Sequence, residues 1–473
     1  MSNRLSRLIV PAMIAICCLF VLYAIFRPAY FSNADELDTL LFFQVLLAAI
    51  WKYHSRFFPL LLAAFLWAGT TLPLSVVWTS GRWFILAAGA LVGFVVYISD
   101  QRLRFATFHL VAFFCVVAAF VSAAVSAYSG TAFLKAMSLL LLFLYGSSGA
   151  RLAAMGTEAR FFSRLLTGCE LLVYVTAVAY FGFQYEMYGN PNSLGAIMGV
   201  AVAPIMLWGI LVSERPAVRW RRTFAFTLAL LLLFSSYARA GIAAAIVSCI
   251  LLCVALRRYG LLIRGLGVAL LLAALVSAAV PLHQQSSDSL TSTFVYKGRQ
   301  EEGILASRRS VWDSTVSAIQ EHPWFGSGFG TSKINGEVVQ QSRSFESLPR
   351  ATREHGNSYL AITEWVGFVG DIPFFALVVL TVTNVVRALA HVRRTGDPFS
   401  PVIPLAGVLA AGLVHAAFED WLFAVGYYLC IFFWTLSFIM VDILPATVRL
   451  PVQRGVRTSA SWANNFGVAA SRP

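Results

Sequence analysis

The hydrophobic positions of this chain form long continuous blocks and rarely alternate with polar ones. A helix needs about 20 apolar residues to cross the hydrocarbon core of a bilayer. Blocks near this length recur along the sequence, and several are short, so we expect an all-α, polytopic membrane protein with about 12–14 transmembrane helices. The candidate spans are approximately residues 8–26, 37–51, 57–78, 83–98, 105–127, 131–150, 165–185, 192–212, 223–237, 240–256, 261–281, 358–386, 402–417 and 421–443.

Composition supports the same class. Of 473 residues, 59% are hydrophobic and only 12% are charged, with a mean hydropathy of +0.75. A soluble domain carries roughly 25% charged residues, so this chain lacks the polar surface to cover a soluble particle of its size. A soluble enzyme, a disordered chain, a coiled coil and a collagen are therefore excluded.

The net charge of +13 gives no reason to expect nucleic acid. The distribution of the basic residues instead predicts how the protein is oriented in the membrane. Basic residues concentrate in cytoplasmic loops of membrane proteins, and here they fall in alternate connections. This pattern predicts that both termini are cytoplasmic, in an inner membrane if the cell is Gram-negative. The basic connections contain Lys52/Arg56, Arg102/Arg104, Arg151/Arg160/Arg164, Arg215/Arg219/Arg221/Arg222, Arg257/Arg258/Arg264 and Arg387/Arg393/Arg394.

One polar stretch interrupts the apolar blocks and divides the chain. Residues 282–357 contain eight basic and eight acidic side chains, and the parity of the spans puts them outside, in the periplasm. The chain then divides into transmembrane residues 1–281 with the first 11 candidate spans, the loop 282–357, the C-terminal spans 358–443 and a cytoplasmic tail, 444–473. Neither the cysteines nor the histidines show a metal-ligand spacing, so we expect no metal and no cofactor.

The loop contains a short amphipathic helix. Trp312, Val316 and Ile319 recur at helical spacing, and the helix should end at His322-Pro323. Arg308, four residues before Trp312, shares its face. Arg308, or Arg309 beside it, could contact a diphosphate. The glycines of residues 326–330 suit either a turn or a phosphate cradle.

Arg239 lies between two short apolar blocks, near the outer tip of a predicted helical hairpin. Ionised side chains in or beside hydrocarbon are costly and are usually functional. The planar guanidinium fork of arginine suits phosphate, so Arg239 is a candidate anion ligand, although snorkelling to the interface is the simpler alternative.

His355 stands where the loop re-enters the membrane, with Asn357 or Ser358 as the helix cap. An imidazole can act as a general base near neutral pH, and Glu354 or Glu364 could orient it. Between the last two spans, residues 415–420 should face outward, where packing and sugar contact are equally compatible with the sequence.

These features together resemble the O-antigen ligase and polymerase superfamily of bacterial membrane proteins, over roughly residues 190–370. The matching elements occur in the family's order, although Gly356 here separates His355 from Asn357. They are Gly189-Asn190-Pro191-Asn192 before a span, Ala238-Arg239-Ala-Gly in a hairpin, Arg308-x-x-x-Trp312 followed by Pro-x-x-Gly-x-Gly, and Asn357-Ser-Tyr-Leu followed by Glu364-x-x-Gly-x-x-Gly.

The resemblance implies a metal-independent, inverting glycosyltransferase at the periplasmic face. Its donor would be a glycan on undecaprenyl diphosphate, and its acceptor lipid A–core or a growing polysaccharide. Arg239 and Arg308 would bind the diphosphate, and His355 would deprotonate the acceptor. Membrane lipids would surround the protein. The further substrate-binding candidates are Arg309, Asn357, Glu354, Glu364, Trp312 and Asn192.

Other functions remain compatible with the sequence. A transporter or flippase for lipid-linked sugars would share the spans, the basic residues and the anionic substrate, although transporters favour midplane sites and internal repeats. A peptidoglycan polymerase is a second alternative. Within the superfamily, the sequence does not distinguish a ligase from a polymerase.

Overall fold

The computed structural model describes residues 57–73, 75–99, 105–279, 306–332 and 354–444, together with Leu47. Within these ranges the chain is helical and contains no strand, which confirms the expected all-α class. The helices are α3 (Phe57–Ala68), α4 (Ser75–Ser99), α5 (Thr107–Val125), α6 (Ser129–Tyr145), α7 (Arg151–Ala154), α8 (Glu158–Ala177), α9 (Pro191–Ala196), α10 (Ala203–Leu211), α11 (Pro216–Ser235), α12 (Arg239–Ala255), α13 (Tyr259–Ala279), α14 (Ala306–Glu321), α15 (Ser358–Thr395), α16 (Val402–Ala416) and α17 (Tyr428–Ile443), with π-helical turns η3 (Gly146–Ala150), η4 (Val178–Gly182) and η5 (Ile197–Val202).

Within the described ranges, six helical segments are long and apolar enough to cross a bilayer. The polytopic character is therefore confirmed. The predicted boundary between residues 57–78 and 83–98 is wrong, because α3 ends at Ala68 and α4 begins at Ser75. The intervening turn is stabilised by Thr70 Oγ1, which donates to the Trp67 carbonyl at 2.7 Å. The candidate span 8–26, the span 37–51 apart from Leu47, and the tail after Leu444 lie outside the described residues.

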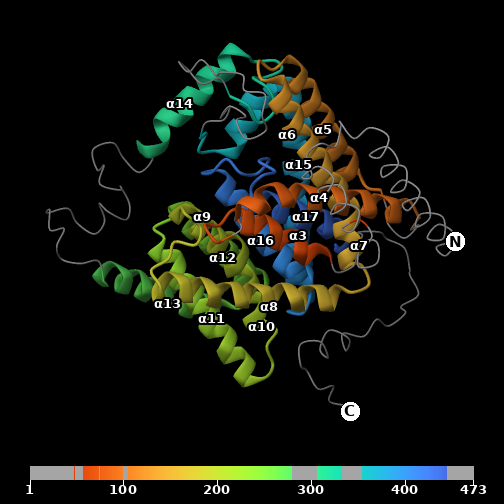
Figure 1. Cartoon of the computed structure of the whole chain (residues 1–473). Coiled ribbons are helices and arrows are strands. Elements are labelled where there is room, and N and C mark those ends of the chain that lie inside the picture. The colour runs from red at the N-terminus through yellow and green to blue at the C-terminus, as the bar shows by residue number, and fades with distance from the viewer. Residues whose placement is uncertain are drawn as a thin grey trace, which may run out of the picture.

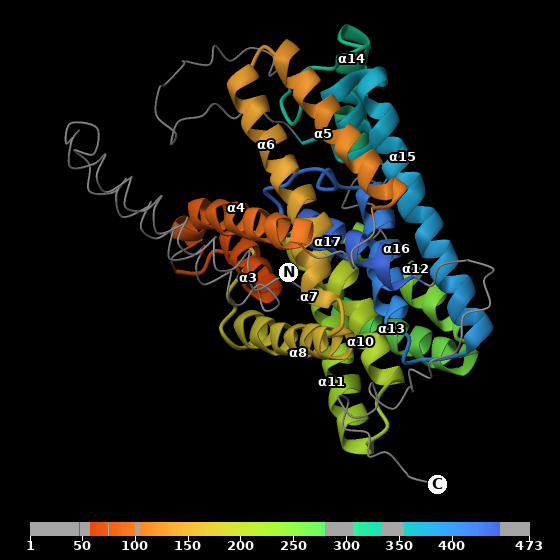
Figure 2. The same ribbon diagram turned by 90° about the vertical axis from the view of Figure 1, so that its right-hand side faces the viewer.

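Two helices far apart in sequence form one long pair. α15 packs along α5, and Figures 1 and 2 show α14 at the end of this pair. α14 also packs on α15. The helix that carries Arg308 is thereby placed beside the segment that carries His355.

Glycines bring the α9–η5 segment into backbone contact with α12. A Cβ on Gly199 would lie 2.2 Å from the Gly241 carbonyl oxygen, and one on Gly241 would lie 2.4 Å from that of Gly195. Small residues four apart allow such close helix packing in membranes. This contact fixes α12 immediately after Arg239, its first residue.

α15 is broken at Gly367, where φ is 67° and ψ is 176°. The break frees backbone groups that lipid cannot satisfy, and the segment following α14 pairs with them. Ser327 and Gly328 donate their N–H groups to the carbonyls of Glu364 and Trp365 at 2.9 and 3.1 Å. In return, Phe368 and Val369 donate to the carbonyls of Pro323 and Trp324 at 2.7 and 3.2 Å.

This pairing explains the glycine-rich stretch after α14. Gly326 has a φ of +73°, and a Cβ there would lie 2.4 Å from the Trp365 carbonyl oxygen. α5 and α6 support the same segment, since Ser126 Oγ donates to the Ser327 carbonyl at 2.9 Å and Lys135 Nζ donates to that of Gly330. The stretch therefore braces the broken helix through its own backbone.

Replacing Gly326 tests the brace against a matched control. Gly156 has the same φ of +73°, but a Cβ there would meet nothing within 4 Å. Gly156→Ala should cost only the left-handed backbone strain, about 1–2 kcal/mol. Gly326→Ala should cost about 1–3 kcal/mol more, because its methyl group overlaps α15. Thermal unfolding of the purified variants measures the difference, and equal losses would contradict the brace.

Candidate active site

His355 is held by Asp420, from the connection between α16 and α17. One carboxylate oxygen, Oδ2, lies 2.9 Å from the imidazole Nδ1 and accepts the His355 backbone N–H, also at 2.9 Å. Ser358 fixes this connection to the start of α15, because its hydroxyl donates to the Glu419 carbonyl at 2.5 Å and accepts from Leu422 N–H at 3.1 Å. In the neutral ring this arrangement favours the proton on Nδ1 and a lone pair on Nε2.

The second ring nitrogen faces two further polar groups. His355 Nε2 lies 3.0 Å from Ser332 Oγ and 3.4 Å from Glu364 Oε2. The ring packs edge-on against Trp365 with centroids 5.4 Å apart, and His355 is 0% exposed. Nε2 is therefore closed to solvent, and a reactant could reach it only by displacing the Ser332 hydroxyl or the Glu364 carboxylate.

The carboxylates set the charge of this imidazole. Burial alone would lower the pKa of His355, but hydrogen bonds and charges of Asp420 and Glu364 outweigh it, so the pKa is raised above its usual value. Burial alone would raise the pKa of Asp420, but its hydrogen bonds to His355 lower it overall. The two groups thus stabilise each other as an ion pair.

Arg308 lies between two carboxylates at the edge of this cluster. Its Nη1 donates to Glu354 Oε1 at 3.0 Å and its Nη2 donates to Glu419 Oε1. Trp312 Nε1, one turn along α14, donates to the Gly356 carbonyl at 3.2 Å. α14 is thereby attached to the segment just before α15, and the Arg308 side chain remains 16% exposed.

Gly356 makes this arrangement possible. Its φ is +62°, and a Cβ would lie 2.7 Å from Arg308 Nη1. The glycine that separates His355 from Asn357 therefore admits the guanidinium against the backbone.

Arg239 approaches the same group of side chains from α12. Tyr237, two residues earlier, has a left-handed φ of 51°, which turns the chain between α11 and α12. Arg239 is partly exposed, and the positive charge of Arg308 acts on it. Two arginines separated by 69 positions in the sequence are thus close enough to influence one another.

Three other candidates from the sequence do not join this group of side chains through any hydrogen bond or ion pair of their own side chains among the described residues. Asn357 caps α15, because its Oδ1 accepts from the N–H groups of Tyr359 and Leu360 at 2.8 and 3.2 Å. The backbone N–H of Asn192 donates to Asn190, the cap of α9, at 2.8 Å. Arg309 is exposed and has no hydrogen-bond or ion-pair partner among the described residues.

Two expectations about neighbours change. Val316 is 42% exposed, whereas Thr315 is buried beside Ile319, so the buried face of α14 is rotated from the predicted one. Glu364 approaches His355 as expected, but Glu354 binds Arg308. The main partner of His355, Asp420, lies 65 positions away, and the acidic pair Glu419-Asp420 between two apolar blocks was its only sequence signal.

The His355–Asp420 pair predicts a pH dependence of stability. A raised histidine pKa adds stability that is full below its unfolded value, about 6.5, and lost as pH rises through the folded one. A lowered aspartate pKa adds stability that is present above about 3.9 and lost as pH falls through the folded one.

We therefore expect Asp420→Asn to lower the melting temperature more at about pH 6 than at about pH 9. The exposed Asp313 of α14 provides the control, since Asp313→Asn should show no such pH dependence. If the melting temperatures of wild type and Asp420→Asn differ by the same amount at every pH in this range, the ion pair is refuted.

Within the described ranges, no three histidine, cysteine, aspartate or glutamate side chains are grouped so that they could hold a metal ion. No curated protein sequence matches the chain. Residues 224–375 match the family model described as O-antigen ligase, and this range includes Arg239, Arg308 and His355. The resemblance to the O-antigen ligase and polymerase superfamily is therefore confirmed over this part of the membrane protein.

Proposed function

We propose that this protein is a metal-independent, inverting glycosyltransferase of the bacterial inner membrane. It transfers a glycan from undecaprenyl diphosphate to a sugar hydroxyl, on lipid A–core or on a growing polysaccharide, at the periplasmic face. The observation that carries the proposal is the grouping of Arg308 with the Glu419-Asp420 connection that holds His355, close enough to Arg239 of α12 for the two arginine charges to interact.

The arginines provide for the anionic end of the donor. In the bond that breaks, the diphosphate oxygen leaves the anomeric carbon with the electron pair, and negative charge grows on the diphosphate. Guanidinium groups from α12 and α14 can stabilise that charge with paired hydrogen bonds. Arg308 now binds Glu354 and Glu419, so we expect the diphosphate to replace at least one of these carboxylates.

The imidazole provides for the acceptor. The acceptor oxygen forms the new bond to the anomeric carbon from the face opposite the diphosphate, while His355 Nε2 takes its proton. Asp420 then stabilises the resulting imidazolium through Nδ1–H. We assign the acceptor hydroxyl to the position of Ser332 Oγ, 3.0 Å from Nε2, so the acceptor must displace this serine.

The raised pKa of His355 has two opposite effects on this role. It makes the neutral imidazole a stronger base, and it reduces the fraction that is neutral at a given pH. The proposal therefore requires the reaction to run near or above the folded pKa. Anionic substrate close to the ring would move this requirement further toward alkaline pH.

Arg239→Lys tests whether the guanidinium fork binds the diphosphate. Lysine keeps the charge but loses the bidentate geometry. Loss of a charged hydrogen bond of about 1.5–3 kcal/mol should reduce transfer roughly 10- to 100-fold. Arg309→Lys, at an exposed arginine, should retain transfer. Wild-type activity of Arg239→Lys at normal membrane abundance would remove Arg239 from the site.

His355→Ala tests both the base and the reaction class. We expect transfer to fall about 10²- to 10⁴-fold, with donor glycan accumulating on its carrier lipid. Full-length polymer on the carrier would indicate a ligase, and single repeat units a polymerase. Ser332→Ala should retain transfer, because its hydroxyl only occupies the acceptor position. Unchanged surface glycan in the His355→Ala strain would reject the base assignment.

A further inference from the structure

A large apolar cavity lies between α3 and α8, apart from the site described above. Its volume is about 720 Å³, and side chains of η5 and α17 complete its wall. On α8 the lining runs from Arg160 to Val175, which is about 22 Å at 1.5 Å per residue. The cavity is therefore long enough along α8 to accept extended hydrocarbon chains.

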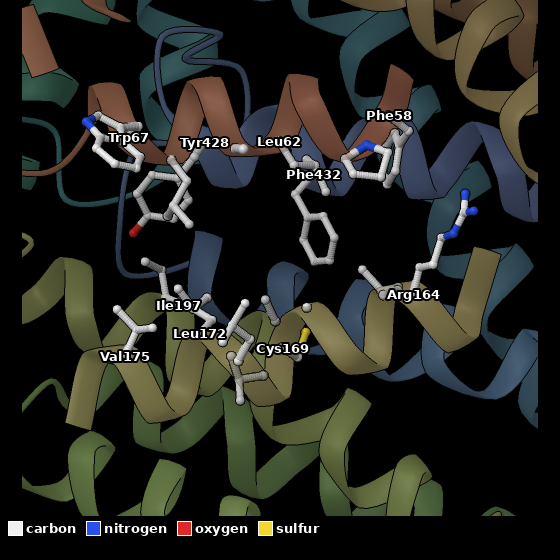
Figure 3. Close-up of a pocket in the computed structure, with 18 of the residues that line it drawn as sticks. Phe58, Leu62, Trp67, Arg164, Cys169, Leu172, Val175, Ile197, Tyr428 and Phe432 are labelled. Atoms are coloured by element: carbon white, nitrogen blue, oxygen red, sulfur yellow. The ribbon is translucent and has the colours of Figure 1, made fainter. Parts of the chain in front are cut away.

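The two ends of the cavity differ in chemistry. Figure 3 shows Trp67 and Tyr428 at one end, and Phe58 and Arg164 at the other, with apolar side chains between them. Arg160 and Arg164 are the only charged residues in the lining. An apolar cavity with two arginines at one end is complementary to an amphiphile that has one anionic end.

The two arginines are suitably placed for a phosphate. They are four residues apart, so they project from the same face of α8, and both are exposed. Within the described ranges neither forms an ion pair with a carboxylate, and the nearby Glu158 accepts a hydrogen bond from Gly156 N–H at 2.9 Å. Two adjacent guanidinium groups at the mouth of an apolar cavity complement a head group with net negative charge better than a zwitterionic one, whose phosphate already has its own cation beside it.

We propose that the cavity binds an anionic phospholipid, with its phosphate on Arg160 and Arg164 and its acyl chains between α3 and α8. The hydrocarbon tail of the donor fits the observations less well. The diphosphate site at Arg239 and Arg308 is assigned to other helices, and a tail entering from there would leave the two arginines of α8 without an anion.

The first experiment quantifies lipids that remain with the purified full-length chain in mild detergent. Mass spectrometry of the extract, compared with the source membrane, should show enrichment of anionic over zwitterionic phospholipid. Arg160→Gln/Arg164→Gln should abolish the enrichment. The control Arg393→Gln/Arg394→Gln removes two exposed arginines at the end of α15 and should leave it unchanged.

A second variant fills the cavity without altering charge. Gly168 lines the cavity, and a Cβ there would meet nothing within 4 Å, so Gly168→Phe should occupy the space and expel the lipid. Gly265→Phe, on α13, is the control, since a Cβ at Gly265 also meets nothing within 4 Å. Gly168→Phe keeps the test valid if the double arginine variant fails to fold.

Addition of a defined lipid completes the test. Phosphatidylglycerol should raise the melting temperature of delipidated wild type but not of Gly168→Phe, whereas phosphatidylcholine or inorganic phosphate should have little effect. Equal anionic lipid in wild type and both cavity variants would overturn the proposal. If polyprenol co-purifies with wild type and with the arginine variant but not with Gly168→Phe, the cavity holds the donor tail instead.

Discussion

The break in α15 at Gly367 is the constraint on which the rest of the site depends. A helix interrupted among apolar neighbours must have its free backbone groups paired by protein, and residues 323–328 do this with four main-chain hydrogen bonds. Because this segment follows α14 directly, the break also fixes the position of Arg308. Because Glu364 lies one turn before the break, the same bonds hold its carboxylate beside His355.

The charges of the site are arranged so that each buried group has an opposite neighbour. His355 lies between Asp420 and Glu364, and Arg308 lies between Glu354 and Glu419. Buried charges are tolerated only when they are paired and hydrogen-bonded. Under the proposed function, a substrate anion would enter by exchanging with a carboxylate on Arg308, so that the guanidinium charge stays compensated before and after binding.

The sequence was most informative where one local rule decided the outcome. Apolar block length predicted the helical membrane class. Capping preference placed the start of α15 at Asn357 or Ser358, and the structure has Asn357 as the cap. Helical spacing located α14 but gave its buried face wrongly at Val316, because Thr315 packs inward through a tertiary contact that periodicity does not encode. The glycines of residues 326–330 could suit a turn or a phosphate, and only their pairing with α15 distinguishes the two.

The start of α17 joins the cavity to the site. Tyr428 lines the cavity and donates to the Ser193 carbonyl of α9 at 3.0 Å, while its hydroxyl lies 2.8 Å from that of Tyr427. The charge of Glu419 in turn acts on Tyr427. Tyr428 thus joins the cavity wall to α9, which packs against α12, and Tyr427 belongs to the connection that carries Asp420. Sequence separation hides this link, since α3, α8 and α17 meet at the cavity, and α17 contacts α9 through Ser193, only in the folded chain.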